Sequence, residues 1–188
     1  MDLSPFKLDL LEALLLLGKP ARATQIAEDM GQNFPPTMMH LLGLIRMGYV
    51  YSPEKSLYAI TENGKKAIDI PETTRETAKK ILAVTPPDKA FHFYACLNTP
   101  INCSTQSLQD FSDKIQKINV ASIEFHLNRG DFEAWFTGLG DTELTIKTLL
   151  LKKKGLTGED LRSRLHEIVE NRYATLAKLV LAPQYATA

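Results

Sequence analysis

The densest group of polar and aromatic side chains lies in the stretch SIEFHLNRGDFEAWF, residues 122–136. Such a group could be a reaction centre, a ligand-binding site, or a helix–turn–helix corner whose polar residues only hold two helices together. Its candidate residues are Glu124, His126, Arg129, Asp131 and Trp135.

Their spacing favours the corner. Glu124 and His126 are two residues apart, so on a helix they point to different sides and are poor partners for acid–base work or a shared metal. Asp131 precedes an apolar run and is predicted to be the N-cap of the helix that follows. His126 lies one turn before Gly130, where it could bond helix-end carbonyls or Asp131, and Trp135 has core spacing. A ligand pocket is the alternative, and no catalytic residue is predicted.

A zinc site is the other chemistry that we considered. His92 and Cys96 share one face of a predicted strand, Cys103 follows in a predicted loop, and His126 could approach them. A Cys-x6-Cys spacing is unusual for zinc, so we predict no metal and no cofactor. The two cysteines are then free thiols, as expected in a reducing cytoplasm.

Charge and hydropathy limit the partners. The 188 residues contain 22 Lys and Arg against 22 Asp and Glu, so the formal net charge is zero. Proteins that coat nucleic acid without sequence preference are normally basic, so DNA binding here requires a local patch. The apolar run over residues 13–17 is too short to span a bilayer, so we expect a cytoplasmic protein that does not contact a membrane.

The first 70 residues predict three helices, a hairpin and a final helix. Apolar periodicity places helices at residues 5–17, in ARATQIAEDMG and in NFPPTMMHLLGLIRMGYV. The β-rich pieces YVY and LYAI flank the turn SPEKS and predict a hairpin. Thr61 is expected to cap the last helix, ENGKKAI.

This order, with the motifs TQIAEDMG and LYAITENGKKAI, resembles the winged helix–turn–helix regulators over residues 5–70. The resemblance implies that the third helix reads bases in the major groove while the wing contacts phosphates. The predicted DNA-binding residues are Gln32, Asn33, Thr37, His40, Arg46 and Lys55, with Lys19, Arg22, Lys65 and Lys66 as further phosphate contacts.

The same segment supports an alternative. Residues 1–70 hold seven Lys and Arg against eight Asp and Glu, a net charge of −1, and PTMMHLLGLI is unusually apolar. A winged helix of this kind could be a protein–protein assembly module that never binds DNA.

Residues 71–89 are interpreted as a connector helix with a Pro-Pro break, and residues 90–188 as a second domain. There KAFHFYACL alternates as a strand, and NTPINCSTQ is predicted to be a loop. Five apolar-periodic stretches predict helices; Asp141 can cap the fourth, and the last covers about 158–181. The expected fold class is mainly α with a small β component: a winged helix followed by a mostly helical α+β domain.

The segment SLQDFSDKI followed by SIEFHLNRGDFEAWFTGLGDTEL resembles a prokaryotic family of unknown function. Thr145 stands where that family usually has alanine, and the resemblance implies no activity. The matching positions are Ser107, Leu108, Phe111, Phe125, His126, Asp131, Phe132, Trp135, Gly140, Asp141 and Leu144.

We therefore expect a sequence-specific DNA-binding transcriptional regulator, not an enzyme, with a C-terminal domain that dimerises or senses a small-molecule effector. The apolar stripe of the last helix runs its full length and needs a partner. That partner is the connector helix or the same helix of a second subunit, and we predict a homodimer that buries residues from about Leu165 to Val180.

Overall fold

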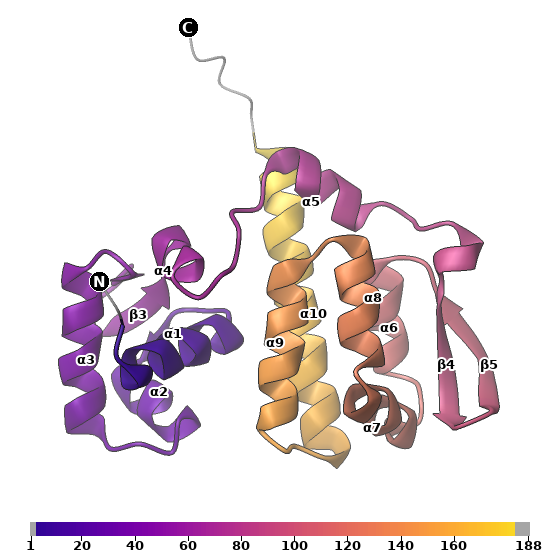
Figure 1. The fold of residues 1–188 in the computed structure, drawn as a ribbon, viewed down its shortest axis with the longest axis horizontal. Helices are drawn as coiled ribbons and strands as arrows, with labels where there is room; N and C mark the ends of the chain where they lie inside the picture. The colour runs from indigo at the N-terminus through magenta and orange to yellow at the C-terminus, as the bar shows by residue number, and fades with distance from the viewer. Residues whose placement is uncertain (1–2, 183–188) are drawn as a thin grey trace, which may run out of the picture. The chain divides into compact units, whose positions relative to one another are not determined.

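The computed structural model describes residues 3–182 and divides the chain into two compact units, Met1–Glu72 and Thr73–Ala188 (Figure 1). Helices dominate both units and each has a small sheet, so the predicted fold class is confirmed. Within residues 3–182, no helix combines the length and apolar character needed to cross a membrane.

Unit 1 combines helices with a small antiparallel sheet. Its sheet order is β1-β3-β2, with Val50 opposite Ile60 and Ala21 opposite Tyr58. Its elements are α1 (Pro5–Leu17), β1 (Ala21–Arg22), α2 (Ala23–Asp29), α3 (Phe34–Arg46), β2 (Val50–Tyr51), β3 (Leu57–Ile60) and α4 (Glu62–Lys66).

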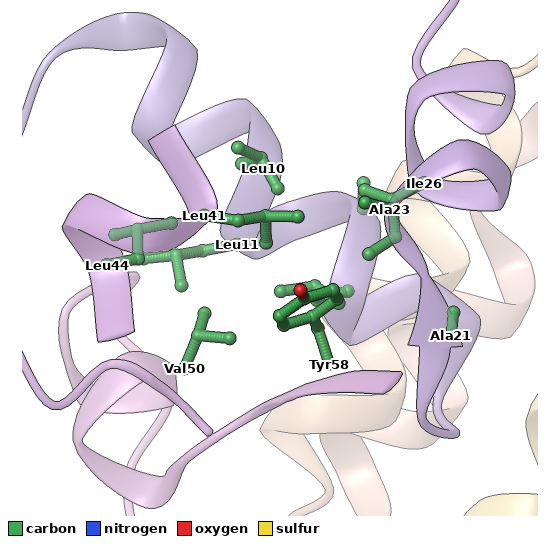
Figure 2. Packing of buried hydrophobic residues seen from close by; sticks show 11 residues of the cluster. Leu10, Leu11, Ala21, Ala23, Ile26, Leu41, Leu44, Val50 and Tyr58 are labelled. Carbon is green, nitrogen blue, oxygen red and sulfur yellow. The ribbon is translucent and has the colours of Figure 1, made fainter. Parts of the chain in front are cut away.

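The core of unit 1 fixes the rotation of α3. Leu10 and Leu11 of α1 pack with Leu41 and Leu44 of α3, and Val50 of the hairpin lies below them (Figure 2). All five side chains are buried. Because one stripe of α3 is held in this core, the opposite stripe faces solvent.

The packing at the end of the hairpin explains why position 64, in the motif LYAITENGKKAI, is a glycine. Thr61 caps α4 as expected, since its hydroxyl accepts the Gly64 N–H at 3.0 Å. A Cβ on Gly64 would lie 2.2 Å from the carbonyl oxygen of Tyr49, so no larger residue fits without moving the backbone.

Unit 2 is a set of helices beside one hairpin (Figure 1). Its elements are α5 (Arg75–Leu82), the 3-10 helix η1 (Pro87–Lys89), β4 (Phe91–Cys96), β5 (Thr99–Thr105), α6 (Leu108–Ile115), α7 (Val120–Arg129), α8 (Asp131–Leu139), α9 (Thr142–Lys153) and α10 (Gly158–Leu181).

The loop predicted at NTPINCSTQ is wrong, because Thr99–Thr105 forms β5. This strand runs antiparallel to β4, with Phe91 opposite Thr105. Asn98 takes a positive φ of 61° in the turn between them, a conformation that asparagine tolerates well. Pro100 is compatible with this strand, because β5 pairs with β4 alone and an edge strand can leave the proline nitrogen unpaired.

The apolar stripe of α10 is buried within a single chain as far as Leu176. Leu165, Ile168, Val169 and Leu176 are at most 2% exposed, and α10 packs on α5, α6, α7 and α9. The connector helix α5 is thus one of the partners of this stripe, and the stretch up to Leu176 needs no second chain to cover it. Leu179 and Val180, which belong to the predicted stripe, are only half-buried. The homodimer itself stays a prediction.

Candidate ligand-binding site

A pocket of about 460 Å³ opens in unit 2 where the β4–β5 hairpin meets α7 and α8. Its volume lies in the range of small-molecule sites. The lining residues are Ala90, Phe91, His92, Tyr94, Leu97, Asn98, Phe125, His126, Arg129, Asp131 and Trp135. Four of the five residues singled out in the sequence therefore come together around one cavity.

Glu124 is the fifth and lies elsewhere. Its Oε1 accepts the backbone N–H of Gly158 at 2.7 Å, so the carboxylate supports the start of α10. This position suits an acidic side chain, because the first N–H groups of a helix have no partner within it and carry partial positive charge.

His126 holds the corner of the pocket through both ring nitrogens. Nε2 accepts the backbone N–H of Tyr94 at 2.8 Å, so Nδ1 carries the proton and donates to Asp131 Oδ2 at 2.7 Å. The imidazole is 2% exposed, and burial lowers its pKa below the ordinary value of 6.5. With both nitrogens engaged, this neutral histidine is a structural link between β4, α7 and α8 and is not available as a general base.

This tautomer predicts a specific loss of stability in acid. The unfolded state takes up the proton as the pH falls through about 6.5, whereas the folded state resists protonation because Nε2 accepts a hydrogen bond. Stability is therefore fully present above that pH and declines below it, by about 1.4 kcal/mol per unit of pKa depression. Urea unfolding at pH 7.5 and pH 5.5 measures the decline. His126→Gln should flatten it, whereas His92→Gln, at an exposed position, should leave it unchanged.

The prediction that Asp131 is the N-cap of α8 is wrong. Gly130 occupies that position with φ 81°, which glycine adopts without strain, so the chain turns one residue earlier. Asp131 is the first helical residue, and its carboxylate accepts from His126 and from Arg129 Nε at 3.2 Å. It thereby ties α7 to α8 by its side chain.

The remaining wall of the pocket combines a cation with aromatic rings. The Arg129 guanidinium carbon lies 5.1 Å from the centroid of the Phe125 ring, a cation–π distance. The spacing of Trp135 predicted a core residue, but the side chain is only half-buried. Its Nε1–H donates to the Lys89 carbonyl at 3.1 Å. Its ring packs on Phe91 and Phe111, with centroids 5.7 and 5.4 Å away.

The predicted base-reading residues in unit 1 divide into two groups. Gln32 and Asn33 are exposed immediately before α3. Thr37 is fully buried and its hydroxyl donates to the Asn33 carbonyl at 2.9 Å, so the prediction that it contacts a base is wrong. His40 is half-buried, and its ring lies 4.6 Å from that of Phe6.

Among the predicted phosphate contacts of unit 1, some basic side chains are in ion pairs and others are exposed. Lys65 pairs with Glu62 at 2.8 Å and Lys66 with Glu72 at 2.7 Å, which reduces their value as phosphate contacts. Arg46 and Lys55 are exposed. The solvent face of α3 also carries exposed apolar side chains, namely Phe34, Met39 and Leu42, which are 47%, 62% and 43% exposed.

Sequence reasoning missed a buried ionic network in unit 2. Arg172 of α10 donates through Nε to both carboxylate oxygens of Asp141 at 3.0 and 2.9 Å, and through Nη1 to Glu143 at 2.8 Å. Lys147 pairs with the other oxygen of Glu143 at 2.7 Å. Asp141 also caps α9 as predicted, by accepting the Leu144 N–H. The sequence did contain a sign of this network, because the charged Arg172 interrupts the apolar stripe of α10 one turn after Ile168.

Glu133 was missed as well. It is 7% exposed, neither carboxylate oxygen has a hydrogen-bond partner among the described residues, and burial raises its pKa.

Of the residues considered for a zinc site, His92 borders the pocket, while Cys96 Sγ lies 3.2 Å from the Thr99 hydroxyl. Within residues 3–182, no cluster of three or more His, Cys, Asp or Glu is arranged to hold a metal ion.

Comparison with known proteins gives one match. A family model described as a family of unknown function (DUF5752) matches residues 65–170, which include the whole pocket and Asp141. No curated protein and no solved structure matches the chain.

Proposed function

This chain belongs to a family of unknown function (DUF5752), and we propose that it is a DNA-binding transcriptional regulator whose second unit binds a small molecule. The observation that supports the proposal is that one chain joins a unit resembling a winged helix, with one face of α3 exposed, to a unit with a pocket of small-molecule size. The winged helix supplies a surface for the major groove, and the pocket supplies a place for an effector.

The exposed start of α3 supports the DNA-binding part. The side-chain amides of Gln32 and Asn33 can each pair with the major-groove edge of adenine. Arg46, at the end of α3, and Lys55, between β2 and β3, can contact phosphates. Because so few cations are available, base contacts must supply much of the affinity. A homodimer, which we also propose, would double the contacts on a palindromic site.

Substitutions at base-reading residues and at phosphate-contacting residues should have different effects on DNA binding. Asn33→Ala should relax sequence preference at one base pair, at a cost of about 1–3 kcal/mol. Arg46→Ala and Lys55→Ala should weaken all duplexes alike, each lowering the salt slope by about 1. Fluorescence anisotropy with duplexes from upstream of the gene, over a salt series, measures both effects. Lys117→Ala, at an exposed position in unit 2, is the control.

If none of these variants changes the binding, α3 is not the DNA-reading helix. The second candidate function then gains support: an assembly module that uses the exposed Phe34, Met39 and Leu42 against a protein partner. In that case, Met39→Glu should abolish partner binding, and the unaltered chain should show no salt-sensitive affinity for duplex DNA.

A further inference from the structure

The Arg129 guanidinium offers the pocket donors that suit an anionic ligand group. Among the described residues that line the pocket, Asp131 carries the only carboxylate, and it is engaged by His126 and Arg129. The Arg129 side chain is 49% exposed and that of Asp131 only 29%, so the cation is the outer partner of this pair. Arg129 uses Nε for Asp131, and none of the hydrogen bonds described for it involves the terminal nitrogens. These nitrogens form the edge that typically binds a carboxylate in bidentate fashion.

The walls of the pocket favour a flat apolar group. Phe91, Tyr94, Phe125 and Trp135 contribute rings from β4, α7 and α8. The indole N–H of Trp135 is already used by Lys89, so its ring offers an apolar face and not a further donor. Rings of this kind pack best against another aromatic ring, in offset-stacked or edge-to-face geometry.

We propose that the pocket binds a small aromatic carboxylate, with the ring against Trp135 and the carboxylate on the terminal nitrogens of Arg129. The inference deepens the proposed sensing role of unit 2 and rests on it, but ligand binding itself does not depend on DNA. Phe125 and Asp131 hold the guanidinium from two sides, so little side-chain freedom remains to be lost when the ligand binds.

The chain provides its own reporter for this binding, because Trp135 is its only tryptophan. The experiment titrates the full chain with benzoate, benzamide and cyclohexanecarboxylate and follows tryptophan fluorescence. Benzoate should give a saturable change. Benzamide, which lacks the charge, and cyclohexanecarboxylate, which lacks the flat ring, should each bind at least about tenfold more weakly, a difference of about 1.4 kcal/mol.

Substitution at Arg129 tests the carboxylate contact directly. Arg129→Gln should weaken benzoate binding at least about tenfold. Arg129→Lys, which keeps the charge but loses the planar fork, should give an intermediate affinity. Lys117→Gln, at an exposed position in unit 2 that does not line the pocket, should leave the affinity unchanged. A thermal melt of each variant shows whether it is folded, and the comparison of the three ligands on the unaltered chain needs no variant.

Three results would overturn the proposal. If benzamide binds as tightly as benzoate, the carboxylate is not what the pocket recognises. If cyclohexanecarboxylate binds as tightly as benzoate, the aromatic ring is not recognised. No saturable change with benzoate up to about 10 mM, ten times the midpoint of a millimolar ligand, rejects the ligand class. Benzoate binding without any DNA binding would instead uphold this inference and reject the regulator.

Discussion

Replacing Arg172 with methionine is expected to lower the free energy of unfolding of unit 2 by about 3–5 kcal/mol. The guanidinium is 2% exposed and lies between Asp141 and Glu143, which are also buried. Glu143 would keep its pair with Lys147, but Asp141 would lose the cation that neutralises it. A buried carboxylate without its partner is costly, and this one also caps α9.

Urea unfolding followed by Trp135 fluorescence measures this loss, because the only tryptophan lies in unit 2. Arg164→Met on the same helix removes an ion pair near the surface and should cost less than about 1 kcal/mol. Adding Asp141→Asn to Arg172→Met should recover part of the stability, since the remaining side chain is uncharged. A loss for Arg172→Met no greater than that of the control would contradict the structural role of this network.

Phe111→Ala is expected to cost about 3–5 kcal/mol, the range for deleting a buried phenylalanine ring. Phe111 is completely buried, and its centroid lies 5.2–6.0 Å from those of five other aromatic rings. Those rings are Phe91, Phe93, Phe132, Trp135 and Phe136, so its removal leaves a cavity directly behind the pocket wall.

The same urea experiment measures this effect, and the emission of Trp135 in the folded variant should also change, because its ring packs on Phe111. Phe34→Ala, at an exposed position in unit 1, is the matched control and should leave the stability of unit 2 unchanged. Unaltered emission together with a loss below about 1 kcal/mol would show that the aromatic cluster does not support the pocket wall.

Local signals predicted most of the fold. The bounds of α10 were predicted from its periodicity, and Thr61 and Asp141 were recognised as caps because a cap depends on residues only three positions away. The strand β5 was missed although its hairpin pairing with β4 is local, because it contains Pro100 and proline is disfavoured in strands other than edge strands. Thr37 was placed on the wrong face of α3, although it lies one turn before Leu41 and belongs to the same buried stripe.

The candidate site was predicted only in part. The bond between His126 and Asp131 was one of two alternatives that the sequence offered, the other being a bond to helix-end carbonyls, since both residues lie in one short segment. The other partner of His126 is the backbone of Tyr94, which comes from a distant strand that no local pattern places beside α7. For the same reason the rim residues His92 and Asn98 could not be assigned to the pocket from the sequence.

The most direct test of the proposed function is a selection from a pool of randomised duplex DNA by the intact chain. Repeated rounds should enrich one shared sequence, and Asn33→Ala should lose preference for it at one base pair while Lys117→Ala retains it. The same selection with Arg46→Ala should give the same sequence at lower affinity. A pool that remains random after selection, with the protein folded and at micromolar concentration, would contradict DNA reading by unit 1.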